Sequence, residues 1–277
     1  MQQIEIRSID KQDFRMKEAY KTLRTNLEFA GRNVKVVALT SCTPNEGKTS
    51  TSLQLALSLA EAGKKTILVD ADLRKSVLRG RYKVSHEKYG LSHYLSGQAD
   101  LDDACCSTNV ENFHVIFAGP VPPNPSELLG GDNFKSMVDT LRKEYDYVII
   151  DTPPLGSVID SAVVARECDG VVIVIESGAI SYKFVQNVKG QLDRADCRIL
   201  GCVLNKVNMS RNSYYGKYYG KYYGKYYGHE NEEGAPLQES IVKKKKNGEK
   251  TSGKKVTVEP EKQGTEEEFE LVLEDAD

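Results

Sequence analysis

The stretch that decides the fold is residues 34–52, Val-Lys-Val-Val-Ala-Leu-Thr-Ser-Cys-Thr-Pro-Asn-Glu-Gly-Lys-Thr-Ser-Thr-Ser. Its first six residues are largely apolar and rich in β-branched side chains, which is typical of a strand buried on both faces. A turn with Pro44 and Gly47 follows, and after Lys48 the apolar residues recur at helical spacing. A strand, a loop and Gly-Lys-Thr at the start of a helix form an arrangement that binds phosphate.

This arrangement predicts a nucleotide site. Lys48 would neutralise the β- and γ-phosphates, and the Thr49 hydroxyl would bind Mg²⁺. The loop departs from the usual pattern because Cys42 stands where a glycine is expected. The alternative is an ordinary strand–turn–helix with a chance Gly-Lys-Thr, so the rest of the chain has to decide. The residues predicted to bind the nucleotide are Pro44, Asn45, Glu46, Gly47, Lys48, Thr49 and Ser50.

Acidic residues end two further apolar segments. Asp70 and Asp72 follow a predicted strand at 66–69, and Asp151 ends another at 147–150. Ligands of open α/β sheets bind at the carboxyl ends of strands. Two aspartates two residues apart lie on one side of a strand, and carboxylates hold Mg²⁺, often through water. A single aspartate there is commonly a turn residue, but together with the loop these residues favour a nucleotide–metal site.

The remaining periodicity alternates strands with helices. The strands are apolar throughout, which indicates a parallel sheet covered by helices on both faces. Residues 75–112 are polar and mixed, and we expect helices and loops there. Further strands are predicted at 113–118, 171–175 and 198–204, the last ending at Asn205, and helices at 13–30, 127–143 (with Ser126 as cap), 158–166 and 181–194.

Composition excludes several classes of function. The formal net charge of the 277 residues is −2, too small for nucleic-acid binding by charge alone. The six cysteines contain no Cys-x-x-Cys and the four histidines show no ligand spacing, which argues against a zinc site and for reduced thiols in the cytosol. No apolar run is long enough to span a bilayer, so we expect that the chain does not cross a membrane by itself.

By composition the chain divides into three parts. Residues 1–210 are predicted to form one α/β domain. Residues 211–228 contain Tyr-Tyr-Gly-Lys three times and then Tyr-Tyr-Gly, and residues 229–277 are blocks of like charge. Because both segments are poor in aliphatic residues, we expect them to be a disordered C-terminal tail.

Several motifs together resemble one family. The loop, Asp70-Ala-Asp72-Leu-Arg74, Ile150-Asp151-Thr-Pro-Pro, the Gly-Pro-Val-Pro-Pro-Asn-Pro-Ser-Glu-Leu run from Gly119 and the tyrosine repeat look like a bacterial tyrosine kinase of the polysaccharide-export type. The resemblance covers about residues 8–228. It implies a P-loop NTPase-like α/β fold with the deviant Walker A motif of MinD and ParA. It also implies an ATP-dependent, non-specific protein-tyrosine kinase that autophosphorylates its tail in trans and regulates capsular and exopolysaccharide synthesis and export.

The resemblance assigns roles to residues. The catalytic residues would be Asp70, Lys48 and Asp72, with Asp70 accepting the proton of the attacking tyrosine. Mg²⁺ would be held by Thr49, Asp72 and Asp151, and Asn205 would contact the adenine of ATP. The phosphoacceptors would be Tyr214, Tyr215, Tyr218, Tyr219, Tyr222, Tyr223, Tyr226 and Tyr227.

The resemblance also implies partners. In this family Glu-x-x-Arg-x-x-Arg on the N-terminal helix builds a homo-oligomeric ring, and here the positions are Glu18, Lys21 and Arg24. A lysine lacks the planar fork of arginine, which weakens the expected ring. A membrane adaptor would supply an activating cytoplasmic tail and recruit the cytoplasmic chain to the inner face of the plasma membrane. A cognate tyrosine phosphatase would reverse the modification.

Three rival interpretations remain. A MinD/ParA-type regulatory ATPase without protein kinase activity would carry a signature lysine where this chain has Thr43. An iron–sulfur scaffold ATPase would carry Cys-x-x-Cys. The tyrosine repeat could stack on single-stranded nucleic acid, at about 1–3 kcal/mol per base, but three lysines among eight tyrosines give little electrostatic attraction. We therefore expect a kinase and no nucleic-acid partner.

Overall fold

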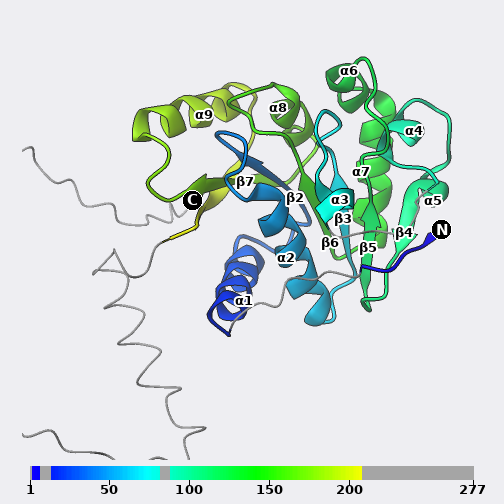
Figure 1. Ribbon diagram of the computed structural model, residues 1–277, viewed down its shortest axis with the longest axis horizontal. Helices are drawn as coiled ribbons and strands as arrows, with labels where there is room; N and C mark the ends of the chain where they lie inside the picture. Colours follow the sequence, from blue (N-terminus) through cyan, green and yellow to red (C-terminus); the bar gives the residue numbers. More distant parts are fainter. Residues whose placement is uncertain (1, 7–13, 82–87, 208–277) are drawn as a thin grey trace, which may run out of the picture. The chain divides into compact units, whose positions relative to one another are not determined.

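A computed structural model of the chain describes residues 2–6, 14–81 and 88–207 (Figure 1). The tyrosine repeat at 211–228 and the charged extension at 229–277 lie outside the described residues, and so do the predictions made for them.

The centre of the described fold is an eight-stranded sheet (Figure 1). All neighbouring strands are parallel except β4 and β5, which run antiparallel. The prediction of a parallel sheet is therefore correct for the central strands and wrong at this edge. In spatial order the strands are β1 (Gln2–Gln3), β4 (Cys105–Ser107), β5 (Phe113–Ile116), β3 (Thr66–Asp70), β6 (Tyr147–Asp151), β2 (Val36–Ser41), β7 (Gly170–Glu176) and β8 (Ile199–Asn205).

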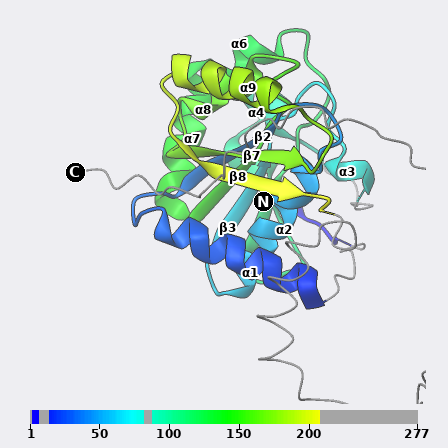
Figure 2. The same ribbon diagram turned by 90° about the vertical axis from the view of Figure 1, so that its left-hand side faces the viewer.

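Helices cover both faces of the sheet, as predicted (Figures 1 and 2). One face packs against α1 (Phe14–Phe29) and α2 (Lys48–Glu61). The other packs against α4 (Leu91–Leu95), α6 (Pro125–Leu129), α7 (Asp132–Glu144), α8 (Asp160–Ala165) and α9 (Tyr182–Arg194). The short helices α3 (Leu78–Arg81) and α5 (Leu101–Ala104) lie in connections.

Alternation along each strand divides the core in two. On β2, Val36 and Ala38 belong to the cluster beneath α7 and α8, whereas Val37 and Leu39 belong to the cluster beneath α2. Successive side chains of a strand point to opposite faces, and both faces here are covered. This is why the strands are apolar without interruption.

The structure corrects the predicted helix at 127–143. It consists of α6 and α7, because Gly130 and Gly131 separate them. Ser126 is not a helix cap: it lies inside α6, and its hydroxyl donates to Asp160 Oδ1 at 2.6 Å. The mixed region 75–112 also contains the unpredicted strand β4, in which Cys105 and Cys106 are buried. The other predicted elements agree with the structure to within two residues at each end.

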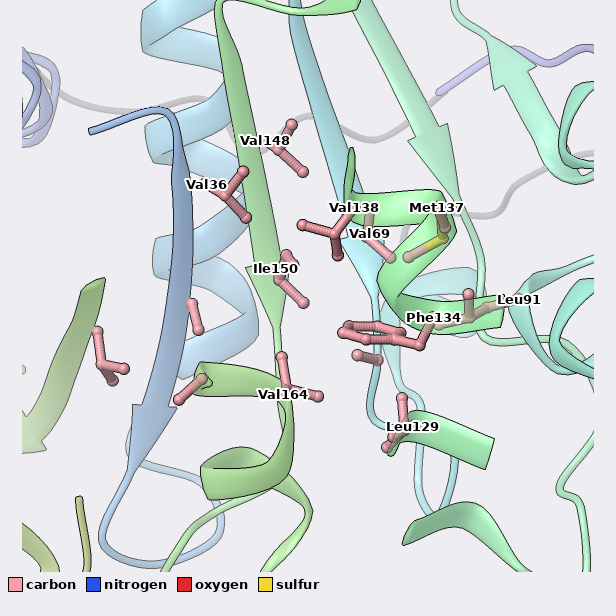
Figure 3. Packing of buried hydrophobic residues seen from close by; sticks show 14 of the residues in the cluster. Val36, Val69, Leu91, Leu129, Phe134, Met137, Val138, Val148, Ile150 and Val164 are labelled. Carbon is pink, nitrogen blue, oxygen red and sulfur yellow. The ribbon is translucent and has the colours of Figure 1, made fainter. Parts of the chain in front are cut away.

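Phe134 on α7 lies at the centre of the cluster that seats α7 on the sheet (Figure 3). Figure 3 shows its ring among Leu129, Val164 and Ile150, which come from α6, α8 and β6. The side chain is fully buried. Three helices therefore pack around one aromatic ring, close to the ends of the central strands.

Replacing this ring should destabilise the domain. Phe134→Ala is expected to lower the free energy of unfolding by about 3–5 kcal/mol, because the lost burial is accompanied by a cavity. Urea denaturation would measure the change. Phe29→Ala is the matched control, since that phenylalanine is 82% exposed and its loss should cost no more than about 0.5 kcal/mol. Equal losses in the two variants would contradict the packing described.

Candidate nucleotide site

The phosphate loop lies between the end of β2 at Ser41 and the start of α2 at Lys48. Two of its residues have left-handed backbone conformations, Asn45 with φ 69° and Gly47 with φ 93°. A Cβ on Gly47 would lie 2.0 Å from Asn205 Nδ2, so both backbone and space require glycine there. Cys42, which replaces the usual glycine, is fully buried in the core, and burial raises the pKa of its thiol to about 12. The cysteine that departs from the usual motif is thus accommodated in the hydrophobic core.

Lys48 and Asp151 form a buried ion pair at the start of α2. Lys48 Nζ lies 2.7 Å from Asp151 Oδ1, and the two side chains are 7% and 1% exposed. The same ammonium donates to Thr49 Oγ1 at 3.3 Å, and Ser52 Oγ donates to Asp151 Oδ1 at 2.9 Å. The structure therefore brings Lys48 and Thr49 together with Asp151, 103 positions after Lys48, and their roles toward phosphate and Mg²⁺ stay predictions.

Asp70 lies directly beside this pair. It is the register partner of Asp151 across β3 and β6, and it is buried. Burial, followed by the charge of Asp151, raises the pKa of Asp70 to about 7, although a hydrogen bond from Ser76 and the charge of Lys48 act in the opposite direction. Ser76 Oγ donates to Asp70 Oδ2 at 2.5 Å. A carboxyl group with this pKa can accept or release a proton near neutral pH.

The Asp-x-Asp turn is held by its own backbone. Asp70 Oδ1 accepts from the Asp72 N–H at 3.2 Å, and Asp72 Oδ1 accepts from the Lys75 N–H at 3.0 Å. These bonds fold the chain after β3 so that Ser76 reaches Asp70. Asp72 is 9% exposed, the most open of the three predicted site carboxylates.

Arg74 is a residue whose role the sequence did not reveal. Its guanidinium forms a two-pronged bond with Asp160, Nε to Oδ2 at 2.7 Å and Nη2 to Oδ1 at 3.0 Å. Burial would raise the pKa of Asp160, but the hydrogen bonds from Arg74 and Ser126 lower it. The pair ties the Asp-x-Asp turn to α8. Its only sequence signal was the arginine two positions after Asp72.

The surroundings of the predicted metal ligands suit one kind of ion. Asp151 Oδ2 is buried and has no hydrogen-bond partner within the described part of the chain, and the Thr49 hydroxyl is near Lys48. No group of three or more histidine, cysteine, aspartate or glutamate side chains among the described residues could form a protein cage for a metal. Mg²⁺ typically takes one or two carboxylates and completes its shell with phosphate oxygens and water. The carboxylate oxygen of Asp151 that is unpartnered among the described residues is a donor of the type that Mg²⁺ takes.

The side chains of two predicted nucleotide-binding residues, Asn205 and Glu46, form hydrogen bonds within the protein. Asn205 Nδ2 donates to the Glu46 carbonyl at 2.8 Å, which places this amide against the loop. The Glu46 carboxylate is 2% exposed and accepts from Thr43 Oγ1 at 2.7 Å and from the Glu176 N–H at 3.0 Å. The adenine contact of Asn205 stays a prediction, and any contact of Glu46 with nucleotide would use its backbone.

The predicted ring residues lie on α1, apart from these strand ends. Lys21 Nζ pairs with Glu18 Oε1 at 2.7 Å, and Arg24 Nη1 donates to the Ser58 carbonyl on α2 at 2.7 Å. Their role in oligomerisation stays a prediction.

The sheet, the loop and the carboxylates at the strand ends define a P-loop nucleotide-binding protein. The family described as AAA domain matches residues 34–198. The tyrosine-protein kinase CpsD of Streptococcus agalactiae is 46% identical over 205 residues, which cover 72% of this chain and 90% of that protein. The kinase domain of the Escherichia coli tyrosine kinase ETK has a TM-score of 0.65 at 35% identity, covering 69% of this chain and 77% of that one. The cell division ATPase MinD of Pyrococcus furiosus is more distant. Its TM-score is 0.55 at 25% identity, and the match covers 64% of this chain and 74% of that one.

The chain belongs to the bacterial tyrosine-protein kinase family. The predicted family and fold are therefore confirmed, and the kinase interpretation is favoured over the MinD-type alternative. Among the described helices, none has both the length and the apolar character needed to cross a bilayer.

The requirement for glycine at position 47 of the phosphate loop can be tested with a matched pair of variants. Gly47→Ala should weaken ADP binding tenfold or more, about 1.4 kcal/mol, because the loop must leave its left-handed conformation or displace Asn205. Gly63→Ala is the control, since Gly63 also has a positive φ but a Cβ on it would meet nothing within 4 Å. Titration calorimetry with ADP should show normal affinity for Gly63→Ala. Normal affinity for Gly47→Ala would contradict the geometry.

Proposed function

We propose that this chain is a Mg²⁺-dependent ATP:protein-tyrosine phosphotransferase that modifies the tyrosine repeat at its own C-terminus. The observation that carries the proposal is the pairing of Lys48 and Asp151 beside Asp70 at the phosphate loop. It supplies a cation for phosphate and a proton acceptor within one site. The proposed acceptors are Tyr214, Tyr215, Tyr218, Tyr219, Tyr222, Tyr223, Tyr226 and Tyr227.

Binding of ATP requires Lys48 to exchange partners. Its ammonium is held by Asp151 in this structure, and it would turn to the β- and γ-phosphate oxygens. The first N–H groups of α2 add positive potential at the same place. Thr49, Asp72 and Asp151 would hold Mg²⁺, which supplies charge stabilisation at the phosphates when bound.

Asp70 is the proposed proton acceptor. The tyrosine oxygen forms a bond to the γ-phosphorus, the bond from that phosphorus to the bridging oxygen of ADP breaks, and the phenolic proton passes to the Asp70 carboxylate. A free tyrosine has a pKa of about 10, so an acceptor assists the reaction at neutral pH. The bond from Ser76 to Oδ2 fixes the carboxylate while it does so.

The proposal extends to the wider assembly that the family resemblance implies. We infer that the kinase acts in the cytoplasm at the inner face of the plasma membrane, recruited by an adaptor whose tail completes the site, and that it regulates capsular or exopolysaccharide synthesis. A homo-oligomeric ring through Glu18, Lys21 and Arg24 and a cognate tyrosine phosphatase belong to the same proposal. In such a ring, Lys21 and Arg24 would exchange their contacts with Glu18 and Ser58 for contacts with a neighbour.

A mixing experiment tests the kinase and the direction of transfer. A Lys48→Ala chain with intact tyrosines is incubated with an active chain whose tail tyrosines are Phe, with ATP and Mg²⁺. Phosphotyrosine should appear on the Lys48→Ala chain, because transfer between subunits needs only one active site. Mass spectrometry would locate it within 214–227.

The Lys48→Ala chain alone is the control and should remain unlabelled. Labelling of that chain without its partner would refute Lys48 as the phosphate-binding cation. A mixture without label, together with labelling of the intact parent chain, would restrict the reaction to the intramolecular route.

The proposed role of Asp70 as proton acceptor can be tested separately from nucleotide binding. Asp70→Asn should lower the rate of phosphoryl transfer by about 10²–10⁴-fold and leave ADP affinity nearly unchanged, because proton acceptance matters only in the transition state. Single-turnover kinetics and ADP titration would measure the two quantities. Equal losses in rate and affinity would assign Asp70 to metal binding or to structure instead.

A further inference from the structure

The conformation of the phosphate loop is held by one buried side chain of the loop itself and by three residues at the ends of β7 and β8. We call Glu46, Glu176, Asn205 and Lys206 the loop latch. Glu46 is its buried member: its carboxylate accepts from the Thr43 N–H and hydroxyl and from the Glu176 N–H. A desolvated carboxylate is tolerated only where donors surround it, so these bonds fix the loop to the last residue of β7.

The end of β8 supplies the other half of the latch. Lys206 Nζ donates to the Asn45 carbonyl at 2.6 Å and pairs with Glu176 Oε2 at 2.7 Å. Asn205 Nδ2 donates to the Glu46 carbonyl at 2.8 Å. Lys206 itself has φ 56°, a left-handed backbone that turns the chain at the end of the strand. Two successive residues of β8 and its turn therefore hold two successive carbonyls of the loop.

The hydrogen bonds to these two carbonyls also fix the direction of the loop's backbone N–H groups. A trans peptide is planar, and its N–H points opposite to its C=O. The bond from Lys206 to the Asn45 carbonyl therefore orients the Glu46 N–H, and the bond from Asn205 to the Glu46 carbonyl orients the Gly47 N–H. Backbone N–H groups at this place in a phosphate loop are the ones that meet phosphate oxygens.

The loop needs such support because its own conformation is unfavourable. Asn45 and Gly47 both have positive φ, which costs free energy for the non-glycine residue. Contacts from outside the loop are what hold such a conformation, and donors already oriented before ATP arrives lose less entropy on binding.

We infer that the side chains of Lys206 and Glu46 position the phosphate loop for nucleotide binding: they hold it in its binding conformation through its carbonyls and its buried side, and neither side chain touches the nucleotide. The affinity for nucleotide is then coupled to the position of residues 205–206, and the coupling is reciprocal. In the sequence Tyr214 follows Lys206 by eight residues, so the coupled segment is the one from which the tyrosine repeat extends.

The test uses the full-length chain and ADP. Lys206→Ala should weaken ADP binding by roughly two- to fivefold, the range expected for a partly exposed charged contact. Lys206→Arg keeps donors at this position and should lie nearer to the parent. Lys189→Ala is the matched control, because Lys189 also makes an exposed ion pair, with Asp193 on α9 at 2.8 Å, and should leave the affinity unchanged.

Hydrogen exchange reports the loop itself. In the absence of nucleotide, amides in residues 42–50 should exchange faster in Lys206→Ala than in the parent or in Lys189→Ala, whereas residues 182–194 should not change. A purely structural role for Lys206 would alter both segments or neither. ADP should slow exchange at residues 199–207 in the parent chain and less so in Lys206→Ala.

Glu46→Gln is the second variant, because it keeps the shape of the side chain and removes its charge. It should weaken ADP binding about tenfold or more, as hydrogen bonds to charged groups are stronger than those to neutral ones. Unchanged ADP affinity and unchanged loop exchange in Lys206→Ala would overturn the role of Lys206. A Lys206→Arg variant as weak as Lys206→Ala would show that the donor is not what matters, and ADP without effect at residues 199–207 would overturn the coupling.

Discussion

The buried ion pair between Lys48 and Asp151 is the interaction on which the site depends. It joins the first residue of α2 to the last residue of β6, and both side chains are almost entirely removed from solvent. Losing one partner of such a pair leaves an uncompensated charge, at a cost of about 3–5 kcal/mol. Because Asp151 is also the register partner of Asp70, the same contact sets the distance between the phosphate loop and the proposed proton acceptor.

Even with this ion pair, the site carries more negative than positive charge. Asp70 and Asp151 lie side by side, Asp72 is close by in the chain, and Asp151 Oδ2 has no partner among the described residues. One lysine cannot neutralise three carboxylates, and the pKa of Asp70 is raised by burial first and then by the charge of Asp151. A divalent cation brought in with ATP would relieve this repulsion and free Lys48 to bind phosphate, so the two ligands would favour each other's binding.

The sequence was sufficient for the strands of the central sheet, but not for their order, because parallel strands buried on both faces leave long apolar runs, each followed here by a helix. It failed where signals were short. The strand Cys105–Ser107 is too brief to show a period, and its antiparallel pairing with β5 has no local signature. The break at Gly130 and Gly131 is a local signal that the apolar spacing on either side concealed. The Arg74–Asp160 pair, 86 positions apart, lay beyond any periodicity argument.

The phosphate loop was recognisable in the sequence, but the contacts that hold its conformation were not. Its motif assigned Glu46 to the nucleotide by position, and that assignment stays a prediction. No sequence signal indicated that the Glu46 carboxylate accepts from the Glu176 N–H, 130 positions later, or that the Asn45 carbonyl accepts from Lys206, 161 positions later. A phosphate loop is recognisable from sequence because its glycine and lysine are local, whereas the contacts that keep it in shape come from wherever the fold brings donors. Here the fold brings them from the end of β7 and from the end of β8, the last described strand before the tyrosine repeat. Asn205 and Lys206, which hold the loop carbonyls, are the described residues of this strand end that lie nearest in sequence to the proposed substrate, so the inferred coupling concerns the segment that leads to it.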